Sequence, residues 1–206
     1  MILARKEIVM GTEYVVKQLL QENDGWLTLK EVLEQGISKY EFYKFAEKSG
    51  LERAGQGIYV SADVWPDSMY LIHLRSAQAI FSHETALFLH DMTDREPSYY
   101  SVTVRTGYNP HRLKEDGIKV YTIRKELHEL GKSNIKTPFG HIVPVYDIER
   151  TLCDILRSRN GVEIQVFQDA LKSYAKRRDK NLRSLMQFAE ALNVSAILKP
   201  YLEVLL

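Results

Sequence analysis

The chain has 206 residues, a length that fits one domain or two, and 45% of them are hydrophobic, too large a share for a disordered polypeptide. Its 28 basic and 27 acidic residues leave a net charge of +1, so a nucleic-acid binder of this composition must sort its cations onto one face. The single cysteine, Cys153, excludes an intrachain disulfide and a cysteine-based zinc cluster.

The first predicted element is a helix over residues 13–23, in which Val16 and Leu20 belong to an apolar series at helical spacing. Thr12 is its expected N-cap. Gly25 suits the left-handed position beyond the end of this helix, so the chain is expected to leave it in a tight turn.

Two short helices with the same start signal follow. Thr28 and Ser38 are each followed three residues later by a glutamate, the pattern of a capping box, and Gly36 and Gly50 mark the two helix ends. So few residues separate the helices that a helix-turn-helix arrangement is expected. The next residues, 51–60, read as strand, glycine turn and strand. This order predicts a winged helix-turn-helix DNA-binding domain over the first 66 residues.

A domain boundary is expected at Pro66, because proline disfavours helix at the residue before it. Residues 67–206 are predicted to form a mixed α/β domain with a mainly helical C-terminus, which places the chain in the α+β class. Ser82 is expected to cap one of its helices. Helices are predicted at 70–80, 83–92, 148–159, 162–178, 182–192 and 196–206, and strands at 98–106, 118–125 and 140–147.

The second short helix exposes a face of lysines and tyrosines once its apolar stripe is buried. Lysine can meet phosphates, tyrosine can donate hydrogen bonds or stack on a base, and the following hairpin is placed to touch the DNA backbone or minor groove. The candidate DNA-binding residues are Thr28, Ser38, Lys39, Tyr40, Tyr43, Lys44, Lys48, Arg53, Gln56 and Tyr59. An ordinary solvated helix face is the competing interpretation, since residues 1–66 hold eight basic and ten acidic side chains.

A second basic surface is predicted near the C-terminus. It consists of Lys172, Lys176, Arg177, Arg178, Lys180 and Arg183, called here the basic C-terminal patch. These cations either add phosphate contacts or bind another acidic surface. The alternative is that they stabilise a helix C-terminus and a solvated turn.

Signals for catalysis, cofactors and metals are poor. His83 and His90 lie two helical turns apart, whereas the zinc-protease motif places its histidines one turn apart. No acidic residue stands two positions before a lysine, the spacing that metal nucleases of the restriction type need. A nucleic-acid-processing enzyme is therefore disfavoured, and we expect a protein without enzymatic activity, cofactor or metal.

The location of the protein is predicted from what the sequence lacks. No stretch approaches the roughly 20 apolar residues of a membrane helix, and the N-terminus has no signal-peptide pattern. Together with the lone Cys153, this predicts a cytoplasmic protein with no membrane partner.

Three stretches of the chain, taken in order, carry a resemblance to one family. They are residues 27–60, SHETALFLHDMTDREP at 82–97 and VYDIERTLCDIL at 145–156. They resemble, respectively, the N-terminal domain, the core signature and the E-R-T-L-x-D block of the AbiEi antitoxins from abortive-infection toxin–antitoxin systems. The chain departs from the family pattern at Asp91, where glycine is common.

The resemblance implies a two-part role in phage defence. The N-terminal domain would bind inverted repeats in double-stranded DNA upstream of its own operon and repress transcription. The C-terminal domain would counter a nucleotidyltransferase-like toxin without a stable complex. The alternative is an interaction protein that neutralises its partner by direct binding through the basic C-terminal helices.

Overall fold

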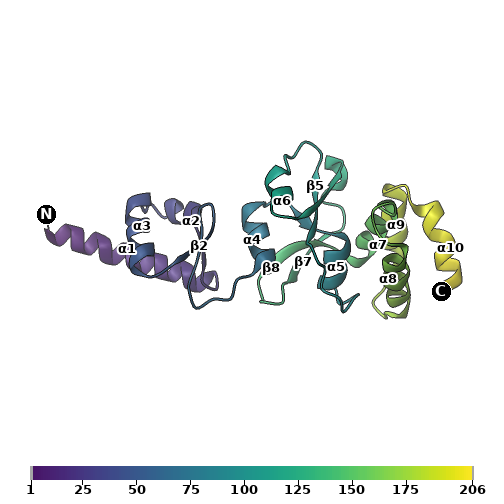
Figure 1. The fold of residues 1–206 in the computed structure, drawn as a ribbon, viewed down its shortest axis with the longest axis horizontal. Helices are drawn as coiled ribbons and strands as arrows, with labels where there is room; N and C mark the ends of the chain where they lie inside the picture. The colour runs from purple at the N-terminus through teal and green to yellow at the C-terminus, as the bar shows by residue number, and fades with distance from the viewer. Residues whose placement is uncertain (1, 206) are drawn as a thin grey trace. The chain divides into compact units, whose positions relative to one another are not determined.

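The computed structural model describes residues 2–205, with side chains from residue 11 onward. Over these residues the chain is mixed α/β, with 49% helix, 16% strand, ten α-helices and two sheets. It divides into two compact units, an N-terminal unit (Met1–Arg75) and a C-terminal unit (Ser76–Leu206) (Figure 1). Each unit is described by itself.

The N-terminal unit combines four helices with a small sheet. Its elements are α1 (Ile2–Glu22), β1 (Trp26–Thr28), α2 (Leu29–Glu34), α3 (Lys39–Lys48), β2 (Glu52–Gly55), β3 (Ile58–Val60) and α4 (Ser68–Arg75). The strands form an antiparallel sheet in the order β1-β3-β2, so the predicted hairpin β2–β3 gains β1 as a third strand. The sequence did not predict β1, which is only three residues long and runs directly into α2.

The first helix differs from its prediction. Helix α1 begins well before Thr12, which therefore lies inside the helix and is not its N-cap. The end of α1 agrees with the prediction, because Gly25 adopts a left-handed φ of 84°. Its backbone N–H then donates to the carbonyl of Leu20 at 2.6 Å. The turn after α1 is thus fixed by a glycine, as expected.

Two apolar clusters hold the N-terminal unit together. Val16 of α1, Val32 of α2 and Phe42 of α3 are fully buried in the first. In the second, Trp26 and Ile58 of the sheet are covered by side chains of α4. Helix α4 therefore belongs to the N-terminal unit, and the units divide after Arg75 rather than at residue 66.

The C-terminal unit is built around a five-stranded sheet. Its elements are β4 (Ile80–Phe81), α5 (His83–Leu89), β5 (Ser101–Arg105), α6 (His111–Glu115), β6 (Lys119–Ile123), a 3-10 turn at Lys125–Leu127, β7 (Lys132–Lys136), β8 (Ile142–Tyr146), α7 (Ile148–Arg157), α8 (Ile164–Lys176), α9 (Leu182–Ala191) and α10 (Ser195–Leu205). The strand order is β6-β5-β4-β8-β7. Pairs β5–β6 and β4–β8 are parallel, and the other two are antiparallel.

Several elements of this unit were not predicted. The stretch 70–80 holds helix α4, a turn and the start of β4, where one helix was expected. The edge strand β7 was missed because its sequence, KSNIK, is almost entirely polar. Helix α6 was not predicted, since it spans only five residues after Pro110. The strands β5, β6 and β8 and the helices α5, α7, α8, α9 and α10 lie where they were predicted.

Helix α7 is the centre of the C-terminal core. Leu152, Ile155 and Leu156 of α7 are buried with Phe167 and Leu171 of α8. Helices α5, α9 and α10 also pack against α7, so it links the sheet layer to the C-terminal helices (Figure 1). Among the helices that the structure describes, none is both long and apolar enough to cross a bilayer.

Candidate nucleic-acid interface

Helices α2 and α3 are set by two capping boxes, both confirmed. Thr28 accepts a hydrogen bond from the backbone N–H of Glu31, whose carboxylate accepts one from the backbone N–H of Thr28 at 2.8 Å. Ser38 and Glu41 repeat this exchange at the start of α3, with the returning bond at 3.0 Å. Each box satisfies amide groups that a helix N-terminus leaves unpaired, which fixes where both helices begin.

The caps change the roles of two predicted DNA-binding residues. The hydroxyl groups of Thr28 and Ser38 each donate to the glutamate of their own box at 2.6 Å. Hydrogen bonds from Ser38 lower the pKa of Glu41, so this carboxyl group stays ionised. Both hydroxyls are thus engaged within the chain. Thr28 and Ser38 therefore position helices α2 and α3, and their hydroxyl groups are not free to contact DNA.

Helix α3 buries one face and exposes the other. Phe42, Phe45 and Ala46 are buried, as the sequence predicts. The ring of Tyr40 is 74% exposed, and the ammonium group of Lys44 lies 6.0 Å from its centroid. This face offers hydrogen-bond donors, a cation and stacking surface, the groups that protein–DNA contacts use.

The lysines of α3 are not equivalent. Lys48 forms an ion pair with Glu13 of α1 at 2.5 Å, and this contact lowers the pKa of Glu13. Lys39 and Lys44 are exposed and form no ion pair with a described residue. The cations free to meet a phosphate on α3 are therefore Lys39 and Lys44.

Aromatic contacts join α3 to the hairpin. Tyr59 of β3 packs edge-on against Phe42 with ring centroids 4.9 Å apart, and the ring of Tyr43 lies 6.5 Å away. Burial raises the pKa of Tyr59, so its hydroxyl remains a donor at neutral pH. Tyr59 is half-buried and supports α3, whereas Tyr43 is exposed.

The hairpin adds one cation beside α3. Arg53 is exposed on β2 and its Nε donates to the carbonyl of Gly55 at 3.2 Å. Gln56 is exposed in the turn, and Gly57 has a positive φ of 70° that closes it. The backbone N–H of Leu29 donates to the carbonyl of Gly57 at 2.7 Å, which ties the turn to the start of α2.

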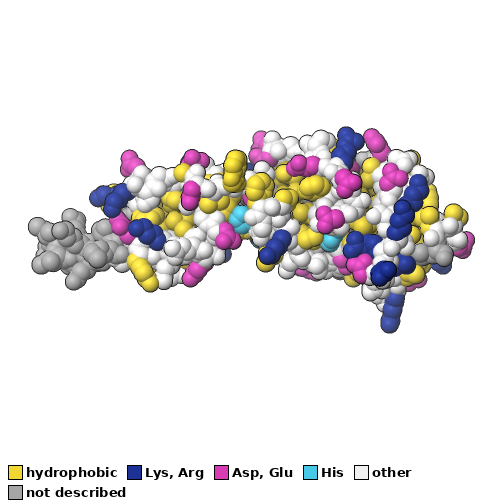
Figure 2. Space-filling view, turned by 90° about the horizontal axis from the view of Figure 1, so that it is seen from below, with side chains coloured by type: hydrophobic (Ala, Val, Ile, Leu, Met, Phe, Trp, Pro, Cys, Tyr) yellow, Lys and Arg dark blue, Asp and Glu magenta, His cyan; other side chains and the backbone are white. Residues whose placement is uncertain are grey.

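The basic C-terminal patch separates into two groups. Lys172 pairs with Asp169 at 3.7 Å, Arg177 makes two hydrogen bonds to Asp179 at 2.9 and 2.7 Å, and Lys180 donates to the carbonyls of Ala175 and Arg177 at 3.1 and 3.0 Å. The members that are exposed and form no ion pair with a described residue are Lys176, Arg178 and Arg183. Basic side chains are visible over these helices in Figure 2, and acidic ones lie among them.

Ser82, Thr85 and His90 of stretch 82–97 bond to other parts of the C-terminal unit. Ser82 makes no side-chain capping bond; its hydroxyl accepts from Thr103 at 2.9 Å and contacts His83 at 3.0 Å instead. Thr85 accepts from the backbone N–H of Ser101 at 2.8 Å. His90 donates to the carbonyl of Tyr146 at 2.8 Å, which joins this stretch to the second block.

Polar side chains of the block at 145–156 also bond to other parts of the C-terminal unit. Arg150 is fully buried, pairs with Asp154 at 3.0 Å and donates to the carbonyls of Leu127 and Leu130 at 2.9 and 2.6 Å. Glu149 accepts hydrogen bonds from the Tyr174 hydroxyl and from the backbone N–H of Asn181, both at 2.9 Å, and so joins α7 to α8 and α9.

His83 is a packed histidine and not a metal ligand of any cluster among the described residues. Its ring is completely buried and stacks on Tyr121 with centroids 3.5 Å apart, and its Nε2 lies 3.0 Å from the hydroxyl of Ser158. Burial lowers its pKa well below the ordinary value, and nearby Arg157 and Lys119 act in the same direction. The run of serine and threonine facing it from β5 was the available signal.

No metal or thiol chemistry is apparent in the part of the chain that is described. Residues 11–205, whose side chains are described, hold no cluster of three or more His, Cys, Asp or Glu side chains placed to bind a metal ion. Cys153 is buried, and burial raises the pKa of its thiol to about 12, so the reactive thiolate is not populated.

No protein-family model matches the chain, and no curated protein matches it at a significant level.

Proposed function

We propose that the N-terminal unit is a winged helix-turn-helix that binds double-stranded DNA, and that the chain represses its own operon. The observation that carries the proposal is the face of α3. It presents the unpaired Lys39 and Lys44 together with the exposed Tyr40 and Tyr43. Arg53 of the adjacent hairpin supplies a further cation. In this arrangement α3 reads the major groove and the hairpin touches the backbone beside it.

The charge of the unit limits how strongly it binds DNA. Its first 66 residues carry eight basic and ten acidic side chains, so only local sorting produces an attractive surface. We therefore expect few phosphate contacts and a modest non-specific affinity. Sequence preference then comes from the tyrosines and lysines of α3, which lie at the centre of the proposed contact.

We propose further that the C-terminal unit acts as the antitoxin part, countering a nucleotidyltransferase-like toxin in a phage-defence operon, and that the protein itself is not an enzyme. This rests on the resemblance of residues 82–97 and 145–156 to the AbiEi antitoxins. Because Ser82, Thr85 and Arg150 are buried and bonded inside the unit, they support its architecture, and the residues of these stretches that remain exposed to a toxin are Asp91, Asp94, Arg95 and Glu96.

The decisive experiment measures the binding of the full chain to its own upstream DNA and to scrambled DNA by fluorescence anisotropy over a salt series. The proposal expects tighter binding to the upstream sequence and an affinity that falls with salt. Equal weak binding to both DNAs would overturn the repressor role.

A direct-binding function is the second candidate, favoured by the unpaired cations Lys176, Arg178 and Arg183. If these side chains dock on an acidic partner, replacing all three by alanine abolishes rescue from the toxin and leaves DNA binding unchanged. Co-purification of a stable complex with the toxin would support this function over neutralisation without contact.

A further inference from the structure

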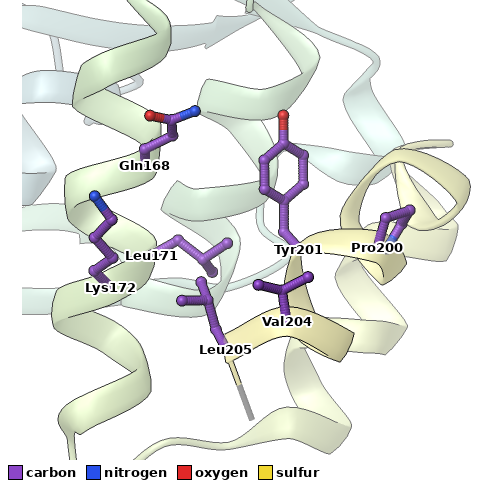
Figure 3. Close-up of a pocket in the computed structure, with 7 residues that line it drawn as sticks. All are labelled: Gln168, Leu171, Lys172, Pro200, Tyr201, Val204 and Leu205. Atoms are coloured by element: carbon purple, nitrogen blue, oxygen red, sulfur yellow. The ribbon is translucent and has the colours of Figure 1, made fainter.

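The C-terminal unit has a hollow between α8 and α10 whose chemistry does not define a ligand (Figure 3). Its volume is about 410 Å³. Among the described residues that line it, the only charged side chain is Lys172, which is more than half exposed and lies 3.7 Å from Asp169. The exposed face of α3 is different, because it combines hydrogen-bond donors with an acceptor that has no partner among the described residues.

This acceptor is Glu47, and it lies on the same strip of α3 as two residues proposed to meet DNA. The buried side chains of α3 determine which side of the helix faces solvent. On the solvent side, Tyr40, Lys44 and Glu47 recur at intervals of four and three residues, the spacing of one helical strip. All three are exposed. A surface that meets Tyr40 and Lys44 therefore also meets the carboxylate of Glu47.

The carboxylate of Glu47 is available for an outside contact. Over residues 11–205, the structure gives it no ion pair and no hydrogen bond, whereas Glu13 binds Lys48 and Glu41 binds Ser38. Local helix stability does not account for it either. Glu47 stands in the last turn of α3, where the negative end of the helix dipole disfavours an acidic side chain.

Double-stranded DNA offers few partners to such a group. An ionised carboxylate accepts hydrogen bonds and cannot donate them, and the phosphates repel it. In the major groove, the exposed donors are the N4 amino group of cytosine and the N6 amino group of adenine. Adenine places its N7 acceptor beside N6, which suits the amide of Asn or Gln. Cytosine N4 is therefore the partner that fits a carboxylate best.

We propose that Glu47 is a specificity-determining residue, which accepts a hydrogen bond from the N4 amino group of a cytosine in the major groove. The inference rests on the proposed binding of α3 to double-stranded DNA. Lys44 supplies affinity through a phosphate, and Glu47 supplies sequence preference from the neighbouring turn. Because an unpartnered carboxylate in the groove is unfavourable, Glu47 also rejects sequences that lack cytosine at this position.

The test is a competition binding assay of the full chain with its upstream DNA and with duplexes in which each base pair is changed singly. The wild type prefers cytosine at one position of its site by roughly fivefold or more, the lower end of what a good base contact contributes. In Glu47→Ala, the four bases at that position bind about equally and the other preferences remain. Glu47→Gln shifts the preference towards adenine, because an amide both donates and accepts.

The matched control is Glu190→Ala. Glu190 is exposed on α9 of the C-terminal unit, so the substitution removes the same charge from a different part of the chain. This variant keeps the wild-type preferences at every position. Since Glu47 is itself exposed, we expect Glu47→Ala and Glu47→Gln to keep the wild-type melting temperature, which thermal denaturation checks.

Two results for the Glu47 variants overturn the inference. If Glu47→Ala binds every duplex more tightly by the same factor, the carboxylate only repels phosphates. If Glu47→Ala keeps every preference of a specifically binding wild type, Glu47 does not contact a base, and the repressor function stands without it. A wild type that binds upstream and scrambled DNA equally overturns the repressor function itself and this inference with it.

Discussion

At the scale of single residues, what distinguishes the three lysines of α3 is what each one contacts. Lys48 is bound to Glu13, whereas Lys39 and Lys44 keep their ammonium groups in solvent. A free ammonium group releases a condensed counterion when it meets DNA, while a paired one brings a carboxylate with it. Residue type alone therefore does not show which of these three lysines can contact a phosphate.

Replacing Lys44 by alanine is expected to weaken binding to upstream DNA and to reduce the slope of log affinity against log salt by about 0.9, the value for one lost phosphate contact. Anisotropy titrations over a salt series measure this slope. Lys136→Ala is the control, because Lys136 is exposed on β7 of the C-terminal unit. A slope unchanged in Lys44→Ala would contradict the placement of α3 on DNA.

Gly131 combines a left-handed backbone conformation with a close approach to the side chain of Arg150. Its φ is 74°, and a Cβ at this position would lie 2.6 Å from the Cβ of Arg150. We expect Gly131→Ala to lower the free energy of unfolding by more than about 2 kcal/mol, since strain and overlap add. Urea denaturation measures the change.

The matched control for this substitution is Gly117→Ala. Gly117 has a φ of 76° but no atom within 4 Å of an added Cβ. Gly117→Ala is expected to lower the free energy of unfolding by only about 1 kcal/mol, the cost of a left-handed backbone conformation at a residue with a Cβ. Equal losses in the two variants would show that the overlap with Arg150 relaxes freely.

At the scale of elements, the contact between α5 and the sheet is unusually polar. Ser82, Thr85, Ser101 and Thr103 bond to one another, and His83 is enclosed among them with a left-handed φ of 51°. Every buried hydroxyl of this group has a partner, so these bonds fix the geometry of the contact in addition to its apolar packing.

This contact makes stability depend on pH. Burial lowers the pKa of His83, so the folded protein keeps the ring neutral while the unfolded chain takes up a proton below about pH 6.5. The resulting stability is complete above that pH and is lost as the pH falls below it. The pKa of His90 is lowered in the same direction, while the pKa of Asp147, raised to about 6 by burial, opposes both.

We expect His83→Asn to flatten the decline of melting temperature between pH 7 and about pH 5, because asparagine does not titrate and tolerates a left-handed φ. The variant is less stable than the wild type at pH 7, since it loses the stacking on Tyr121. His111→Asn, a change at an exposed histidine of α6, serves as the control and keeps the wild-type profile. An equally steep decline in His83→Asn would assign the dependence to other groups.

At the scale of the whole molecule, the chain is two units with separate cores. Helix α4 decides where the first unit ends, because the ring of Tyr70 packs edge-on against Trp26 with centroids 5.5 Å apart. Leu71 and Leu74 cover the same cluster. A fragment that ends before α4 leaves Trp26, a large buried side chain, in contact with water.

We therefore expect a fragment of residues 1–75 to fold cooperatively and a fragment of residues 1–66 to melt at a markedly lower temperature. Full burial of one apolar side chain contributes roughly 1.5–3 kcal/mol, and three partly buried ones are lost in the shorter fragment. Circular dichroism and tryptophan fluorescence, in which the buried Trp26 changes environment and the exposed Trp65 does not, measure both transitions. Equal melting temperatures would show that α4 is dispensable.

Much of this architecture was accessible from the sequence, and the reasons are local. Both capping boxes, the glycine turn at Gly25 and the buried stripe of α3 depend on residues within a few positions of one another. Strands β1 and β4 were missed because each is short and acquires its conformation by pairing with a distant strand, and β7 was missed because its sequence is polar.

The candidate interface likewise combines features that nearby residues determine with contacts between distant residues. The sequence by itself determined that α3 has a buried face and an exposed face of lysines and tyrosines, since helical period alone assigns the faces. Only the tertiary structure decided that Lys48 is paired, that Tyr59 supports α3, and that α4 belongs to the N-terminal unit. These contacts join residues far apart in the chain, and periodicity carries no information about which distant side chains meet.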